Sequence, residues 1–341
     1  MKTLISLVSL LAALPLVTTA QAESSPICLY VSSYHAGYHW NDGIETGLTQ
    51  SLGKACELKR FYMDTLRNKA PEFAAAKGAE AKQLIDAIKP AVVIACDDPA
   101  SKYLVMPYLK NVATPVVFCG VNWTVEPYGY PHDYPHGNVT GMIEVAPIQP
   151  LIQEARSLLP KARQLAFLAA DVPTQHKEVE RLQKVAAAEG LTLSVKLVNS
   201  FAAWRKGFEQ VQNTDLILLG NPAGIHDWDD AAAGRFLQAN TGKTSSQASR
   251  GLTLSFGVAM SRHAVFAMIN MPEEQGEWSG QLARLILAGK SPAELPITAN
   301  RRWQMLANPE LARKIGIRLP ERILQRAVIV DTRTNSTPPG R

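Results

Sequence analysis

The sequence predicts an α/β fold with two Rossmann-like lobes, each built on a parallel sheet that helices cover. Apolar strand segments alternate with helical segments from residue 27 onward, and PAVVIAC (90–96) is one continuous apolar run. Such runs are typical of strands buried on both faces of a parallel sheet. A second alternating series begins near residue 147, and two successive βαβ series predict two sheets. A chain of 341 residues also exceeds the usual size of one hydrophobic core.

The elements follow in order along the chain. The first series predicts strands at 27–31, 57–64, 90–96, 115–119 and 137–142, and helices at 41–52 and 72–88. The second series predicts helices at 147–159, 174–188, 201–213, 229–239 and 273–289, with strands at 164–170, 191–198, 215–220 and 251–257. Residues 331–341 have no apolar period, which predicts a disordered tail.

The first 22 residues have the composition of a secretory signal peptide. Lys2 gives a positive start, LISLVSLLAALPLV an apolar centre, and AQA (20–22) a small-x-small cleavage site. The apolar run is shorter than the roughly 20 residues of a membrane-spanning helix, and Pro15 interrupts it. We therefore expect residues 1–22 to be removed and the mature protein to be periplasmic, not embedded in the membrane.

Charge and cysteine content narrow the functional classes. The formal net charge is +5 with no Lys/Arg-rich run, so nothing favours nucleic acid as a partner. The spacing of Cys28, Cys56, Cys96 and Cys119 fits no zinc motif. In an oxidising compartment the pairs Cys28–Cys56 and Cys96–Cys119 would be natural disulfides if their strands are neighbours. Buried free thiols are the alternative.

Ligands of open α/β sheets bind beyond the carboxyl ends of the strands. After the predicted strands the chain carries aromatic, amide and carboxylate side chains, a mixture expected of a small-molecule pocket between two lobes. These residues are Ser33, Tyr34, Tyr38, Trp40, Asp97, Asp98, Asn122, Trp123, Asp171, Thr174, Asn221, Trp228 and Phe256. Each alone has a plainer explanation, since Asp readily caps helices and Trp seals lobe edges. Their coincidence on one predicted rim favours a pocket.

The segment SSYHAGYHWNDGIETGL (32–48) is the densest part of this rim. Gly37 and the run Asn41-Asp42-Gly43 already supply the residues that a turn needs, so the aromatic residues exceed what geometry requires. A hydrophobic cover over the sheet end is the plain alternative. We expect Tyr34 and Tyr38 to face the cleft.

Catalytic motifs are missing from the sequence. It has no GxSxG elbow, Walker loop, GxGxxG turn or HExxH helix. A hydrolase site built on Ser32-Ser33 and the histidines would lack a Gly-flanked nucleophile. The sequence therefore favours a binding protein over an enzyme, with no cofactor.

A transition-metal site is the sharper alternative. His35 and His39, and likewise His132 and His136, are spaced so that imidazole pairs could share one metal ion. Carboxylates that could orient these ligands are limited to Asp42 and Asp133. A Tyr/His/Pro-rich surface loop explains the same residues.

Several motifs, in this order, resemble the substrate-binding proteins of ABC transporters with the type I periplasmic binding fold. They are Asp98-Pro99-Ala100, TPVVFCGVNW (114–123), GNVTGM (137–142), EEQGEWSGQLARLILAGKSPAELPI (273–297) and ELARKIGIRLPERILQRA (310–327). Known members of that family include tryptophan and tyrosine binders. The variants SYHAGYHWNDGI and VFCGVN resemble a branch also found as extracellular sensor domains. The family pattern departs at Asp97-Asp98 and at Asn122-Trp123, where Thr and Asp-Pro are common.

The resemblance implies a domain layout and a set of contacts. Three crossings near 143, 258 and 290 would divide the chain into an N-terminal lobe (23–142 and 258–290) and a C-terminal lobe (143–257 and 291–330). Carried over by position, the ligand contacts would be Ser33, Tyr34, Asp97, Asp98, Asn122, Trp123, Asp171, Asn221 and Phe256. The lobes would close around a solute by hinge motion.

The resulting hypothesis is a monomeric periplasmic receptor that delivers a small organic solute to an ABC permease. The alternative is a ligand-binding partner of a membrane sensor, which needs the same cleft. Aromatic side chains beside Asp97, Asp98 and Asp171, with no Arg or Lys close to Asn122 or Asn221, favour a planar, cationic or zwitterionic ligand that resembles an amino acid. A strongly anionic ligand would want Arg or Lys in the rim.

Overall fold

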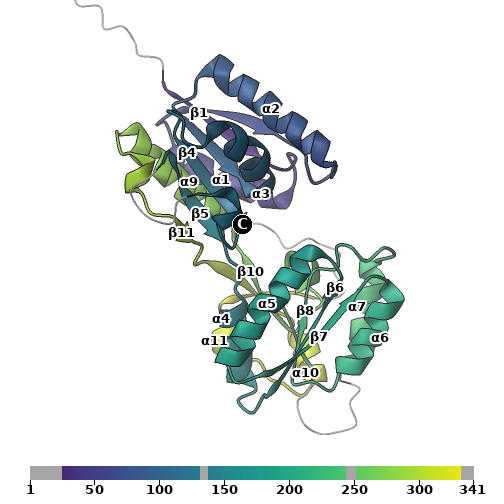
Figure 1. The fold of residues 1–341 in the computed structure, drawn as a ribbon. Coiled ribbons are helices and arrows are strands. Elements are labelled where there is room, and N and C mark those ends of the chain that lie inside the picture. The colour runs from purple at the N-terminus through teal and green to yellow at the C-terminus, as the bar shows by residue number, and fades with distance from the viewer. Residues whose placement is uncertain (1–24, 131–136, 243–250, 332–341) are drawn as a thin grey trace, which may run out of the picture.

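The computed structural model describes residues 25–130, 137–242 and 251–331, and these form two α/β lobes (Figure 1). The first lobe has a six-stranded sheet of order β11-β5-β4-β3-β1-β2, and the second a seven-stranded sheet of order β13-β12-β10-β9-β8-β6-β7. The predicted fold class is thereby confirmed. The predicted signal peptide (1–22) lies outside the described residues, as does all but the first residue of the predicted tail.

The first lobe takes its elements from two stretches of the chain. They are β1 (Ile27–Ser32), α1 (His39–Leu52), β2 (Glu57–Tyr62), α2 (Pro71–Ile88), β3 (Val92–Cys96), α3 (Asp97–Ala100), the π-helix η1 (Ser101–Leu109), β4 (Val116–Asn122), the 3-10 helix η2 (Glu126–Tyr128), β5 (Val139–Glu144), α9 (Pro272–Leu287), the 3-10 helix η3 (Pro292–Glu294) and β11 (Thr298–Ala299).

The second lobe contains the remaining elements. They are α4 (Ile148–Leu158), β6 (Gln164–Ala170), α5 (Pro173–Ala188), β7 (Thr192–Val198), α6 (Phe201–Val211), β8 (Leu216–Leu219), α7 (Asp230–Asn240), β9 (Leu252–Ser255), α8 (Val258–Ser261), β10 (Phe266–Asn270), β12 (Trp303–Ala307), α10 (Pro309–Lys314), α11 (Glu321–Leu324) and β13 (Ala327–Ile329).

Each sheet is buried on both faces, as the apolar runs predict. All five residues of β3 are buried, and alternate side chains enter two different cores. One face of the first sheet packs on α2 and η1, and the other on α1 and α9. In the second lobe α4, α5, α10 and α11 cover one face while α6 and α7 cover the other. Neighbouring strands are parallel except for β10 and β12, which run antiparallel.

Helices α1 and α9 come from distant parts of the chain and pack backbone to backbone. A Cβ atom at Gly276 of α9 would overlap the carbonyl oxygen of Ile44, and one at Gly47 of α1 would overlap the carbonyl oxygen of Glu273. Only glycine permits this approach. The contact fixes α9 on the first lobe, although its sequence follows a strand of the second lobe.

Both disulfides that the sequence allowed are present. Cys28 pairs with Cys56 and Cys96 with Cys119, so the described residues contain no free thiol. Cys96 and Cys119 are direct register partners on the adjacent strands β3 and β4. Both bridges lie in the core under α1 and α9. The alternative of buried free thiols is excluded.

Two of the three predicted crossings were misplaced. The chain leaves the first lobe after β5, which ends at Glu144. It returns only after β10, because residues 266–270 pair with β9 and β12 in the second sheet, so 258–270 does not belong to the first lobe. It crosses again after β11, whose residues pair with β5 in the first sheet. The third crossing therefore follows Ala299, not residue 290.

We expect Gly276→Ala to destabilise the protein, although alanine is intrinsically the better helix former. The added methyl group must push α9 away from α1, and such overpacking costs about 1–3 kcal/mol. Chemical denaturation measures the change. Gln281→Ala, on the exposed face of the same helix, is the control and should leave stability within about 0.5 kcal/mol. A Gly276→Ala protein as stable as the control would contradict the close packing.

Removal of the Cys28–Cys56 bridge by a double serine substitution should lower stability by about 3–4 kcal/mol, because the bridge closes a loop with a sequence separation of 28. Thiol titration under denaturing conditions should find no free thiol in the untreated protein and four after reduction. Free thiols before reduction would contradict both pairings.

Candidate functional site

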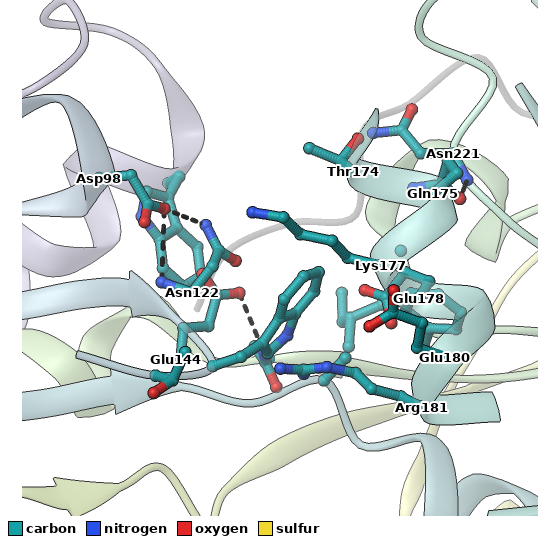
Figure 2. A pocket seen from close by; sticks show the side chains of 18 of the residues that line it. Asp98, Asn122, Glu144, Thr174, Gln175, Lys177, Glu178, Glu180, Arg181 and Asn221 are labelled. Carbon is teal, nitrogen blue, oxygen red and sulfur yellow. Dashed lines mark hydrogen bonds between the residues drawn. The ribbon is translucent and has the colours of Figure 1, made fainter. Parts of the chain in front are cut away.

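A cavity of about 840 Å³ lies between the lobes, beyond the carboxyl ends of the strands of both sheets. Figure 2 shows its two walls, with Asp98, Asn122 and Glu144 on the first-lobe side and residues of α5 with Asn221 on the other. Seven of the predicted rim residues line it: Trp40, Asp98, Asn122, Trp123, Thr174, Asn221 and Phe256. The structure therefore brings together residues that lie up to 216 positions apart in the sequence.

Two predicted contacts are used for structural purposes instead. Ser33 is fully buried, and its hydroxyl donates a hydrogen bond to the Cys96 carbonyl (2.6 Å) and accepts one from the Ala100 amide (2.8 Å). This pair of bonds ties the end of β1 to α3. Asp171 is exposed and bonds its neighbour His176 (2.7 Å). Neither side chain lines the cavity.

Tyr34 and Tyr38 lie beside the cavity but not in its wall. Their rings pack edge to face with centroids 5.4 Å apart, and both side chains are partly buried. Burial and the nearby Asp97 carboxylate raise the pKa of each hydroxyl. Trp228, also predicted on the rim, packs instead against Phe201 and Trp204 in the second lobe.

Asp97 does not line the cavity but binds a side chain that does. Its Oδ1 accepts a hydrogen bond from Trp40 Nε1 (2.8 Å), so the carboxylate orients an indole that lines the cavity. Burial raises the pKa of Asp97 well above its usual range, and the Trp40 bond opposes that shift. A Cβ at residue 120 would overlap Asp97 Oδ1, which explains the glycine there. Asp97 therefore acts through Trp40 and not by direct exposure to the cleft.

Asp98 organises the first-lobe wall. Its Oδ2 accepts from the Asn122 side-chain amide, and its Oδ1 accepts from the Tyr128 hydroxyl. The Asn122 backbone amide adds a third bond to Oδ2 (3.3 Å). With both oxygens already bonded, Asp98 holds Asn122 and Tyr128 in place at the cavity surface.

Helix α5 supplies most of the opposite wall. Thr174, Lys177, Glu178 and Arg181 line the cavity at i, i+3, i+4 and i+7, the spacing of a single helical face. Figure 2 shows Lys177 projecting from this helix into the space between the walls. Only Thr174 had been placed on the rim by sequence reasoning, which considered the first residues after each strand. The helical period of this segment is the signal that could have identified the other three.

Arg181 and Trp123 connect the two lobes. The guanidinium carbon of Arg181 lies 3.6 Å from the centroid of the Trp123 ring. Such cation–π contacts contribute about 0.5–2 kcal/mol, more where water is excluded. Burial lowers the pKa of Arg181, while Glu178 and Glu180 oppose that shift. The cavity thus contains cations that were expected to be missing from it.

Two carboxylates of the cavity have strongly perturbed acidity. Burial raises the pKa of Glu144 to about 7, against a hydrogen bond from the Asn270 side chain. Burial likewise raises the pKa of Glu178 to about 7, partly opposed by Arg181 and reinforced by Glu144. Glu178 is only 3% exposed, and its Oε2 has no hydrogen-bond partner among the described residues.

Glu144 also connects the cavity to the crossings between the lobes. Its Oε1 accepts from Asn270 Nδ2 (2.8 Å), and Asn270 Oδ1 accepts from Asn300 Nδ2 (3.0 Å). Asn300 Oδ1 accepts from the Val145 amide (2.6 Å). These four residues belong to the three segments that join the lobes, so one hydrogen-bond network connects the Glu144 carboxylate to all three crossings.

The metal hypothesis gains no support from the described residues, among which no cluster of His, Cys, Asp or Glu could hold an ion. His35 forms a local bond to the Ala36 carbonyl (3.0 Å) and lies against Tyr38. His132 and His136 lie outside the described residues, so their part of the hypothesis is untested.

Within 25–130, 137–242 and 251–331, no helix is both long and apolar enough to cross a membrane.

Comparison with known proteins identifies the fold. No family model and no curated protein matches the sequence. Among solved structures, an ABC domain in complex with L-Trp from Streptococcus pneumoniae is 18% identical, with 90% of this chain and 100% of that one covered and a TM-score of 0.60.

Two further solved structures are also similar. A ligand-free, open substrate-binding protein with adhesive properties from Clostridium difficile is 13% identical, with 90% and 100% covered and a TM-score of 0.70. A glucose-galactose binding protein from Geobacillus stearothermophilus is 10% identical, with 84% and 98% covered and a TM-score of 0.53. The chain therefore has the two-lobed fold of ABC-transporter solute-binding proteins, the type I periplasmic binding fold that the sequence predicted.

Proposed function

We propose that this protein is a periplasmic solute-binding protein that closes on a small organic ligand and delivers it to an ABC permease, without transforming it. The observation that carries the proposal is the cavity of about 840 Å³ between two lobes joined by three narrow crossings. This volume lies within the range of roughly 300–1,000 Å³ that is usual for small-molecule sites in proteins. The segment 1–22, with the composition of a signal peptide, supports export.

The cavity wall favours a ligand with a planar group and a polar, nitrogen-bearing end. Trp40, Trp123 and Phe256 offer aromatic faces from both lobes. The cavity is also lined by carboxylate and amide side chains of both lobes, and Lys177 and Arg181 add cationic groups on one wall. A zwitterion resembling an amino acid suits this mixture, and the L-Trp complex of a structural neighbour makes that class a natural first choice.

The structure of a sugar-binding neighbour makes neutral sugars the main competing class. Sugars also stack on aromatic rings and bond amides, so geometry alone does not separate the two classes. A thermal-shift screen of amino acids, amines, nucleosides and sugars would do so. Saturation at 100 times Kd should add about 2.7 kcal/mol of stability. A protein that no compound class stabilises would contradict the proposed function.

For any ligand found by that screen, Trp123→Ala should weaken binding at least tenfold and remove most of the ligand-induced change in tryptophan fluorescence. The indole is both a wall of the cavity and the interlobe partner of Arg181. Isothermal titration calorimetry and fluorescence titration measure the two effects.

Trp228→Phe is the matched control for this prediction, since Trp228 is packed among aromatic residues of the second lobe and does not line the cavity. Its affinity should equal that of the unmodified protein. Equal affinities for Trp123→Ala and Trp228→Phe would show that the solute binds elsewhere.

A further inference from the structure

Glu178 is an unusual residue for a cavity wall. It is 3% exposed, lines the cavity, and has an oxygen without a hydrogen-bond partner among the described residues. Burying a carboxylate without a partner is strongly unfavourable, and a cation is the group that would relieve it. The Glu144 carboxylate of the first lobe raises the pKa of Glu178 further, so it adds to the cost of charging that side chain.

The guanidinium of Arg181 contacts an aromatic ring and does not pair with the Glu178 carboxylate. Arg181, one turn along α5 from Glu178, directs its guanidinium onto the Trp123 ring. Glu178 and Glu180 act on it electrostatically, but no salt bridge to it is found in the described part of the chain. The cavity thus contains a planar cation stacked on an aromatic face, together with Glu178, whose Oε2 has no hydrogen-bond partner among the described residues. A guanidinium or ammonium group of a ligand would find the same two kinds of contact.

We propose that Glu178, Glu144 and the face of Trp123 form a cation subsite, that Arg181 covers its aromatic face when no solute is bound, and that a guanidinium- or ammonium-bearing organic solute displaces Arg181 on binding. The inference rests on the proposed solute-binding function and specifies its ligand class. Displacement breaks the Arg181–Trp123 contact between the lobes and replaces it with contacts to the ligand. Through Asn270, a cation at Glu144 also reaches the hinge.

The charged groups around the subsite define its response to pH. Glu178 faces Glu144 from β5, with Asp98 of α3 further along the same wall, and Lys177, Glu180 and Arg181 come from α5 itself. A carboxyl group with a raised pKa stabilises the folded state at low pH and loses that contribution as pH rises through its folded value. The pKa of Glu178 and of Glu144 is about 7, so the window is about pH 4.5 to 7.

The first test needs no ligand. Relative to the unmodified protein, Glu178→Gln should have about the same Tm at pH 5 and a Tm about 2–4 °C higher at pH 8, because the neutral amide removes a buried charge that is present only at high pH. Glu209→Gln, an exposed carboxylate of α6, removes the same charge away from the cavity and should show no such divergence. Equal Tm differences at pH 5 and pH 8 for Glu178→Gln would overturn the subsite.

The second test compares probes of matched shape. L-arginine and L-citrulline differ in that the planar end group is charged in one and neutral in the other. Calorimetry at pH 8 should show L-arginine binding at least tenfold more tightly, and Glu178→Gln should remove that preference. Binding of agmatine should weaken by about 30-fold between pH 8 and pH 5.5 for each carboxylate that must lose its proton.

Arg181→Met tests the displacement directly. Agmatine has no carboxylate with which Arg181 could pair, so removal of the competing guanidinium should tighten agmatine binding several-fold. Weaker agmatine binding by Arg181→Met would overturn the displacement.

The panel also includes L-tryptophan and D-galactose, which separates failure of the subsite from failure of the proposed function. If either binds tightly and the cations do not, the solute-binding function stands and the cation subsite is wrong. If no compound of any class binds, both are overturned.

Discussion

The three crossings between the lobes constrain everything else in this molecule. Because α9 returns to the first lobe after β10, neither lobe is a continuous stretch of chain, and three short segments join the lobes. The same topology makes the strands of both sheets end at one cleft. The glycine contact between α1 and α9 holds this arrangement, since it lets the returning helix approach the first-lobe core at backbone distance.

Hydrogen bonds connect the three crossing segments to a carboxylate of the cavity. Asn270 and Asn300 link the three crossing segments by hydrogen bonds, and the chain of bonds ends at Glu144, whose carboxylate lines the cavity. A group bound to that carboxylate competes with or reinforces the Asn270 bond. Under the proposed function, this hydrogen-bond network is the expected link between the charge of a bound solute and closure of the lobes.

Sequence reasoning identified the elements whose signals are local and missed those that depend on distant partners. The apolar run at 90–96 has the composition of a strand buried on both faces, and all five residues of β3 are buried. The pairing of Cys96 with Cys119 could be predicted only if β3 and β4 were neighbours, and the structure shows that they are. The strand β10 has five residues and β11 has two, and both are stabilised as strands by partners from other parts of the chain. Nothing in the sequence of either strand indicates which sheet it joins, so the second and third crossings were misplaced.

The residues of the site divide in the same way, into those that local sequence signals identify and those that depend on packing. Aromatic and amide residues immediately after strands were identified because topology alone places them at the cleft, as with Trp123 and Asn221. Ser33 was predicted as a ligand contact, whereas its hydroxyl bonds the backbone of Cys96 and Ala100 and does not line the cavity. The sequence does not separate these two uses of a hydroxyl group. Glu178 and Arg181 were missed because their position depends on which face of α5 turns inward, and that face is set by the packing of the helix on its own lobe.

The positions of Glu178 and Arg181 in the cleft balance the stability of the folded chain against the availability of a carboxylate for a solute. The Oε2 atom of Glu178 is buried and has no hydrogen-bond partner among the described residues, which is unfavourable for a charged carboxylate. A direct salt bridge from Arg181 would satisfy both groups. Stacking Arg181 on Trp123 instead keeps a cation in the cavity at modest stability while the carboxylate remains available. On the proposed cation subsite, binding of a cationic solute would relieve this penalty, whereas a neutral isostere of the same shape would relieve none of it.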